Sequence, residues 1–289
     1  MTKPSNVLTV AFLACDKIPE ESEAAHGEYA DVLHNLFEPH IPDHLNLETR
    51  NYDVVNARKY PTEAELDQID AIVISGSFED DADKDTTWIL RLAGFLIRVK
   101  DDYPRIRMIG ICFGLQIIAR AFGPSLIEKN EKGWEVGSTK VNLTKLGKRI
   151  IWDLSDDDEE EGVDVRGHIM MQQIHSDIVR EVPENFELLA YSELTPIQGI
   201  VNFYDSEDVP PFTHSEAHTL PDDPWRKIHI IAFQGHPEWH DGILVPLIDN
   251  YEKDGTFDKE FAKDARERSR QHHDGKRLGQ VLLRVLGVA

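Results

Sequence analysis

The chain has 289 residues, 40% of them hydrophobic, which is enough apolar material for a full core. Its 53 acidic residues against 31 basic ones give a formal net charge of -22, which repels phosphate backbones and argues against a nucleic-acid partner. No apolar run reaches the roughly 18 residues of a membrane helix, the first residues carry no signal-peptide pattern, and only Cys15 and Cys112 occur as cysteines. We therefore expect a cytoplasmic protein without a membrane segment or a disulfide framework.

The first 125 residues alternate between short apolar runs and segments of helical periodicity. Strands are predicted at Val7–Ala14, Leu45–Val55, Ala71–Ser75 and Ile106–Ile111, and helices at Glu28–Phe37, Thr87–Val99 and Phe113–Phe122. Repeated β-α-β units with continuously apolar strands predict an α/β fold, a mostly parallel sheet with helices on both faces. In such sheets, binding sites lie at the carboxyl ends of the strands.

The second half of the chain predicts further strands and a helical C-terminal part. The strands are Val136–Leu143, Glu187–Tyr191, Gln198–Phe203 and Ile228–Phe233, and the helices are Gly242–Tyr251, Phe257–Gln271 and Gly279–Leu286. We find no dividing linker and expect one domain over residues 1–289, with a core at about 7–250 and a helical extension at 251–289.

Two segments interrupt this order. Seven of the nine residues of Asp153–Glu161 are acidic, so this segment repels itself and is predicted to be an exposed loop, taken as residues 153–162. Four prolines fall within residues 205–224, which predicts a long insertion there.

Gly110-Ile-Cys112-Phe-Gly114 follows one predicted strand and begins the next helix. This strand–turn–helix context is that of a nucleophile elbow, in which the small glycines permit a sharp turn. The positive end of the helix favours a thiolate over a thiol. A buried, inert cysteine is the alternative for this motif alone.

Gln234-Gly235-His236-Pro237-Glu238 follows the apolar strand Ile228–Phe233. His236 is therefore expected at the same edge of the sheet as Cys112. A cysteine nucleophile needs a base, and the base needs an orienting acceptor. Glu238, two residues further on, suits that role, so the two motifs together predict a Cys112–His236–Glu238 triad.

A turn of small residues, Ser75-Gly76-Ser77-Phe78, ends the strand that begins at Ala71. Its backbone amides can face a developing oxyanion, and the amide of Phe113, directly after the nucleophile, can supply a second donor. Taken alone, this segment would be an ordinary strand-end turn.

Gly110-Ile-Cys-Phe-Gly-Leu-Gln116 and Gly235-His-Pro-Glu238 resemble the two signature motifs of the class I (triad) glutamine amidotransferases. Ser75-Gly-Ser77 resembles the small-residue oxyanion loop of that family, which is usually Ser-Gly-Gly. Thr144-Lys-Leu-Gly147 and Gln173-Ile-His-Ser-Asp177, followed by Val182-Pro183, match weaker landmarks. The resemblance extends from about Val7 to Leu247 and implies a flavodoxin-like fold.

The resemblance also implies roles for individual residues. Cys112 would attack the γ-carboxamide of glutamine or of a γ-glutamyl compound, His236 would transfer protons, and Glu238 would orient the imidazole. The amides of Ser77 and Phe113 would bind the oxyanion of the intermediate that leads to a γ-glutamyl thioester. The remaining positions would bind the substrate: Gly76, Gln116, His175 and Ser176. No cofactor or metal is implied.

Several functional alternatives stay open. The chain has no room for a synthase domain, so it either supplies ammonia to a separate synthase subunit or acts alone, as stand-alone γ-glutamyl peptidases do on glutathione-like peptides. A non-catalytic binding or regulatory relative is a further alternative. So is another kind of cysteine enzyme with the same type of sheet. His214, His218, His272 and His273 are read as solvated surface residues because no first shell of ligands is complete. No glycine-rich nucleotide motif occurs.

Overall fold

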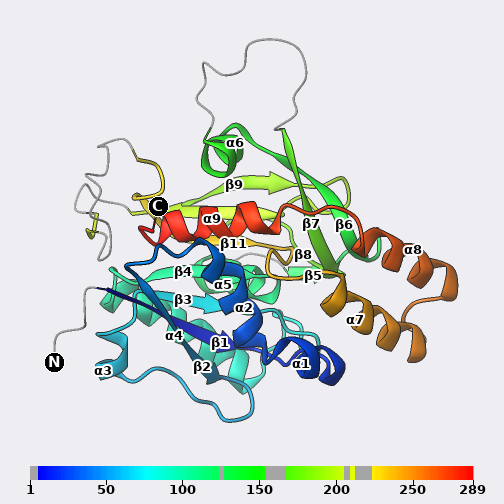
Figure 1. Cartoon of the computed structure of the whole chain (residues 1–289), viewed down its shortest axis with the longest axis horizontal. Helices are drawn as coiled ribbons and strands as arrows, with labels where there is room; N and C mark the ends of the chain where they lie inside the picture. Colours follow the sequence, from blue (N-terminus) through cyan, green and yellow to red (C-terminus); the bar gives the residue numbers. More distant parts are fainter. Residues whose placement is uncertain (1–5, 124–126, 154–166, 205–208, 212–222, 289) are drawn as a thin grey trace.

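A computed structural model describes residues 6–123, 127–153, 167–204, 209–211 and 223–288. Its main sheet has nine strands (Figure 1). Their order across the sheet is β2 (Asn46–Asp53), β1 (Val7–Ala14), β3 (Ala71–Ile74), β4 (Arg107–Ile111), β11 (Ile228–Phe233), β10 (Gly199–Phe203), β9 (Phe186–Tyr191), β6 (Glu135–Leu143) and β7 (His168–His175). Strands β5 (Ile127–Lys129) and β8 (Asp177–Val179) form a separate antiparallel pair.

The sheet is parallel in one half and antiparallel in the other. Strands β2, β1, β3, β4 and β11 run parallel, whereas each pair from β11 to β7 is antiparallel. The parallel half consists of the apolar strands of the first 125 residues and β11, which is the last strand in the sequence. The carboxyl ends of β3, β4 and β11 therefore lie side by side.

Helices cover both faces of the sheet (Figure 1). One apolar layer contains residues of α2 (Tyr29–Phe37), α6 (Lys145–Trp152), α7 (Asp241–Lys253), α8 (Lys259–Ser269) and α9 (Gly275–Val285). The other layer contains residues of α3 (Glu63–Leu66), α4 (Thr87–Asp102) and α5 (Phe113–Phe122). Along β1, Val10 and Phe12 belong to the first layer and Ala11 and Leu13 to the second, as the alternation of a strand requires.

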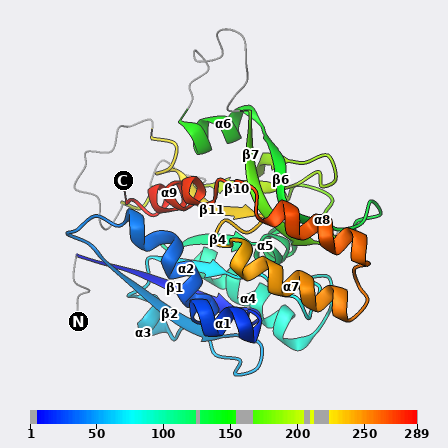
Figure 2. The same cartoon turned by 45° about the vertical axis from the view of Figure 1, so that its right-hand side comes forward.

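The short α1 (Glu20–His26) packs against α7, and the one-turn η1 (Glu38–His40) continues α2. Figure 2 shows α7 and α8 side by side, with α1 next to α7. The predicted C-terminal helical extension is thus confirmed, although α9 begins at Gly275, four residues before the predicted start. None of the helices in the described part of the chain is long and apolar enough to cross a membrane.

The predicted α/β class and its mostly parallel core are confirmed, and every predicted strand is present. The sequence analysis missed β7, whose residues include polar side chains. Gln172 and Gln173 are fully buried there, and their amide groups donate to the Ser269 carbonyl and to Oε1 of Gln198, at 2.8 and 3.0 Å. Periodicity alone does not predict a buried strand of this composition, because the stabilising partners come from distant segments.

The acidic segment and the proline-rich segment lie almost entirely outside the described residues. Of the first, only Asp153 is described, and it ends α6 in the left-handed conformation, with φ of 62°. His214 and His218, which were predicted to be solvated surface residues, also lie outside the described residues.

Two glycines bring helix α5 close to the sheet. A Cβ on Gly114 would lie 2.3 Å from the Ile74 carbonyl oxygen, at the end of β3. A Cβ on Gly110 would lie 2.6 Å from Cδ1 of Ile118. Only a glycine permits this approach of helix and strand, which gives both glycines of the elbow motif the steric role expected from the sequence.

Gly114→Ala is expected to lower the free energy of unfolding by about 1–3 kcal/mol, because the backbone of β3 would have to move. Gly94→Ala in α4 is the matched control, since a Cβ there meets nothing within 4 Å. That change is expected to be neutral or to stabilise the protein by about 0.5–1 kcal/mol through helix propensity. Urea unfolding of both variants measures the difference, and equal stabilities would contradict the packing argument.

Candidate active site

Cys112 lies in the turn between β4 and α5, in a strained conformation with φ of 55° and ψ of -108°. Its amide donates to the Phe233 carbonyl at 2.8 Å, so the turn is attached to the end of β11. The residue is 5% exposed, and it lies at the N-terminus of α5. Positive φ at a non-glycine residue costs free energy that the surrounding packing must supply, and such strain gathers at functional sites.

His236 and Glu238 follow β11, the strand next to β4. The His236 amide donates to the Gln172 carbonyl at 2.8 Å, which holds this turn against β7. Nδ1 of His236 lies 2.8 Å from Oε1 of Glu238, and both side chains are fully buried. A Cβ on Gly275 would lie 2.3 Å from the Pro237 carbonyl oxygen, so α9 begins directly against the His-Pro-Glu turn.

The environment of His236 favours its protonated form. Burial lowers its pKa, but the negative charges of Glu238 and Cys112, and the hydrogen bond to Glu238, outweigh burial and raise the pKa to about 9. An imidazolium between a carboxylate and a sulfur is thus the resting arrangement expected at neutral pH. This arrangement stabilises a nucleophilic sulfur and keeps a proton ready for a leaving group.

Gly76 lies directly beside both reactive side chains. A Cβ at this position would be 2.9 Å from Cε1 of His236 and 3.6 Å from Cβ of Cys112. Nε2 of His236 is buried and makes no well-aligned hydrogen bond to any described residue. Catalytic contacts are often loose before a substrate binds, so this nitrogen is available to a leaving group.

Asp16 holds the loop after β3, which carries the predicted oxyanion residue Ser77. Its Oδ2 accepts from the amides of Phe78 and Glu79, at 2.7 and 3.2 Å. The Ser77 amide, directly before these two, has no acceptor among the described residues. The Phe113 amide, at the first position of α5, lies at a helix N-terminus, where amides lack intrahelical partners.

The other predicted substrate-binding residues lie in hydrogen-bonded positions around this centre. Gln116 is buried in α5, and its Nε2 donates to the Asp177 carbonyl at 3.2 Å and to Oε1 of Gln234 at 3.3 Å. Nδ1 of His175 lies 3.1 Å from the Asp177 carbonyl oxygen. The Ser176 hydroxyl accepts from Lys129 at 3.5 Å. Gln116 and His175 thus both contact the Asp177 carbonyl, which joins α5 to the segment 175–177.

A buried carboxylate supports His175. Nε2 of His175 lies 3.4 Å from Oε2 of Glu135, which also accepts from Thr195, Gln198 and Ser192 at 2.8 to 3.2 Å. Burial would raise the pKa of Glu135, but the hydrogen bond and charge of His175 and the hydroxyl donors lower it below its usual range. Glu135 therefore stays ionised and orients His175.

Three residues that sequence reasoning did not single out contact the triad. Nε2 of Gln234 donates to Sγ of Cys112 at 3.6 Å. The indole of Trp239 stacks on the His236 ring, with centroids 3.6 Å apart and planes 10° apart. The Tyr29 hydroxyl donates to Oε1 of Glu238 at 3.0 Å. Gln234 and Trp239 adjoin the His-Pro-Glu motif, whereas no local signal distinguishes Tyr29.

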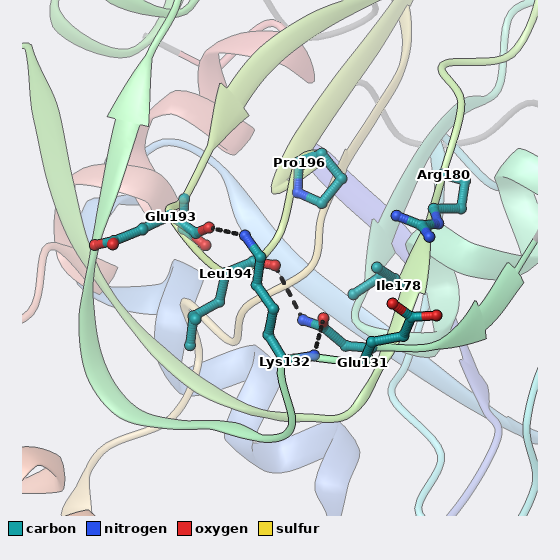
Figure 3. A pocket seen from close by; sticks show the side chains of 9 residues that line it. Glu131, Lys132, Ile178, Arg180, Glu193, Leu194 and Pro196 are labelled. Carbon is teal, nitrogen blue, oxygen red and sulfur yellow. Dashed lines mark hydrogen bonds between the residues drawn. The ribbon is translucent and has the colours of Figure 1, made fainter.

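A separate surface pocket of about 230 Å³ lies next to the Glu135 network (Figure 3). It is lined by Asn130, Glu131, Lys132, Ile178, Arg180, Ser192, Glu193, Leu194 and Pro196. Lys132 donates to the Glu193 carbonyl at 2.6 Å, and Asn130 to the Leu194 carbonyl at 3.0 Å. These polar groups bind each other, and no triad residue lines the pocket.

Within the described residues, no group of three or more His, Cys, Asp or Glu side chains is arranged to hold a metal ion.

Comparisons with known proteins agree with this geometry. The chain is 30% identical over 281 residues to a glutamine amidotransferase-like protein of Schizosaccharomyces pombe, covering 96% of this chain and 98% of that one. It is 28% identical to gamma-glutamyl peptidase 4 of Arabidopsis thaliana, covering 91% and 89%. A glutamine amidotransferase structure from Thermotoga maritima superposes with a TM-score of 0.62 at 15% identity, covering 96% and 98%, which shows the shared fold.

The family model "Glutamine amidotransferase class-I" matches residues 32–205, more than half of the chain. The Cys112 elbow lies within the matched residues, and the His-Pro-Glu turn lies beyond them. The match to this model and the near full-length similarity to the Schizosaccharomyces pombe protein establish that the chain belongs to the class I glutamine amidotransferase family.

Proposed function

We propose that this protein hydrolyses the γ-amide of glutamine or of a γ-glutamyl compound through a thioester on Cys112. The observation that carries the proposal is the meeting of a strained cysteine elbow and a buried His236–Glu238 pair at the carboxyl ends of adjacent strands. Membership in a family of cysteine-dependent amidotransferases and peptidases supports the same chemistry.

In the first half-reaction, the Cys112 sulfur attacks the γ-carbonyl carbon and the carbonyl oxygen becomes an oxyanion. The free Ser77 amide and the Phe113 amide stabilise that charge. The His236 imidazolium then gives its Nε2 proton to the leaving nitrogen, the C–N bond breaks, and a γ-glutamyl thioester remains. Glu238 stabilises the imidazolium and holds its ring in place.

In the second half-reaction, water attacks the thioester carbon. His236, now neutral, accepts the water proton at Nε2, and the same amides stabilise the second oxyanion. The C–S bond breaks, and the sulfur anion is restored beside the His236 imidazolium. Glutamate leaves as its γ-carboxylic acid, which then gives its proton to solvent. The two half-reactions together consume one water and release one amine or ammonia.

Two substrate classes fit this chemistry. A glutaminase would release ammonia, which a separate synthase subunit would use. A stand-alone γ-glutamyl peptidase would release an amino acid or peptide, and the similarity to a protein named gamma-glutamyl peptidase favours this second candidate. Most of the segment 205–224, which could cap the site and select larger leaving groups, lies outside the described residues.

Cys112→Ser is expected to abolish γ-glutamyl hydrolysis while the fold is retained, because a serine hydroxyl is a far weaker nucleophile in this site. Cys15→Ser is the matched control, since Cys15 is also buried but packs in the apolar layer on the other side of the sheet, with its thiol 3.6 Å from the Leu13 carbonyl oxygen. Mass spectrometry after incubation with 6-diazo-5-oxo-norleucine should find the wild-type adduct on Cys112. Turnover by the Cys112 variant, or an adduct on Cys15 instead, would contradict the mechanism.

The pH dependence of kcat/KM is expected to fall above about pH 9, because the raised pKa of His236 keeps the necessary imidazolium up to that pH and no further. Glu238→Gln removes a negative charge that raises this pKa, so the alkaline limb should move to lower pH.

His236→Ala should reduce kcat by on the order of 10²–10⁴-fold, and more than Glu238→Gln does. The reverse ranking would show that the roles are assigned wrongly.

The purified chain is expected to hydrolyse a γ-glutamyl amide or peptide without a partner, because the triad geometry is complete within one chain. Glutamine, glutathione and a glutathione conjugate are compared at equal concentration. Preference for the peptides supports the peptidase, and activity on glutamine alone supports the ammonia donor. If a folded, reduced sample hydrolyses none of them, stand-alone action is refuted.

A further inference from the structure

Tyr29 contacts both halves of the catalytic centre from outside the triad. It is the first residue of α2 and is 4% exposed. Its hydroxyl donates to Oε1 of Glu238 at 3.0 Å and accepts from the Gly76 amide at 3.4 Å. The same oxygen lies 3.5 Å from Nδ1 of His236. One hydroxyl thus connects the carboxylate of the triad to the loop that carries the predicted oxyanion amide.

The hydrogen bonds around Glu238 show why this contact matters. Oε1 accepts from both His236 and Tyr29, while Oε2 is buried and has no hydrogen-bond partner among the described residues. Apart from the imidazole, the Tyr29 hydroxyl is therefore the group that fixes the rotation of this carboxylate. Without it, the carboxylate would be free to turn away from the imidazole.

The hydroxyl is held in the state that this role requires. Burial and the negative charges of Glu238 and Cys112 raise the pKa of Tyr29 well above its usual range. The phenol therefore stays protonated and donates a hydrogen bond to Glu238 throughout the pH range of activity. The ring is fixed by Phe12 and Trp239, whose ring centroids lie 5.2 and 5.9 Å away.

We propose that Tyr29 is a positioning residue that acts through Glu238, holding the carboxylate aligned with the imidazole of His236. This inference rests on the proposed function for its kinetic test. The titratable groups facing His236 are Glu238, Cys112 and the Tyr29 hydroxyl, and those facing Tyr29 are Glu238, Cys112 and His236, with the shorter contact to Glu238. A change at Tyr29 should therefore reach the reaction through Glu238.

Tyr29→Phe keeps the ring packing and removes the hydroxyl. We expect kcat to fall about 10-fold with KM changed by less than about twofold, because one hydrogen bond to a charged group is lost outside the substrate pocket. The alkaline limb of kcat/KM should move to lower pH. Tyr52→Phe is the matched control, since the Tyr52 hydroxyl donates to Oε1 of Glu65 at 3.2 Å on the edge strand β2. That variant should behave as wild type.

A double-mutant cycle separates positioning from a general loss of structure. In a Glu238→Gln background, Tyr29→Phe should reduce kcat by less than about threefold, because the carboxylate through which Tyr29 acts is absent. p-Aminophenylalanine in place of Tyr29 keeps a donor at the same point and should restore most of the lost rate. An equal loss in both backgrounds, a Phe variant with wild-type kinetics, or no recovery with the amine would each overturn the proposal.

The pH profile of Cys112 alkylation by iodoacetamide needs no substrate, so it tests the role of Tyr29 separately from the proposed hydrolysis. If the wild type hydrolyses no γ-glutamyl compound, the proposed function fails, yet the alkylation profile of Tyr29→Phe should still differ from that of Tyr52→Phe. Identical profiles for both variants would overturn the role of Tyr29 whatever the reaction.

Discussion

The hydrogen bond from the Cys112 amide to the Phe233 carbonyl joins residues 121 positions apart and continues the pairing of β4 with β11. The rest of the candidate site depends on it. This hydrogen bond holds the Cys112 turn against the end of β11, the strand that leads to His236. It directly follows the last paired residues of the two strands, Ile111 and Phe233. Because two neighbouring parallel strands end at the same edge, a short turn after each is sufficient to bring a nucleophile and a base together.

Around this junction, small residues and buried polar groups fix the geometry. Gly114 lets α5 approach β3, and Gly76 leaves room for the His236 ring. Asp16 occupies the amides on one side of Ser77, so that the remaining amide is free. Trp239 stacks on one face of the imidazole and fixes the plane of the ring. Each of these contacts limits where His236 and the oxyanion amide can move.

The C-terminal extension belongs to this arrangement as well. Gly275 brings α9 against the Pro237 carbonyl. The Asp274 amide donates to the carbonyl of Met170 in β7, and the Met170 amide donates to Oδ2 of Asp274, both at 2.7 Å. Gln172, two residues along the same strand, accepts from the His236 amide. The last helices thus support the catalytic turn through β7, although they lie far from it in the sequence.

Much of the fold and the centre of the candidate site could be predicted from sequence, because their signals are local. Apolar runs of four to eight residues marked the strands, such as Val7–Ala14, whose bounds agree with β1. The elbow around Cys112 and the turn after Phe233 each carry their chemistry within five consecutive residues. The buried strand β7 was missed because its glutamines look like surface residues until the Ser269 and Gln198 partners are in place.

The sequence by itself thus determined the α/β class, the elbow, the His-Pro-Glu turn and the edge of the sheet where they meet. Only the tertiary structure decided that Tyr29 donates to Glu238, that Gln234 contacts the Cys112 sulfur, and that Glu135 supports His175. The physical reason is range. Periodicity and turn chemistry act over a few residues, whereas these contacts join positions 40 to 209 residues apart and depend on strand order and register.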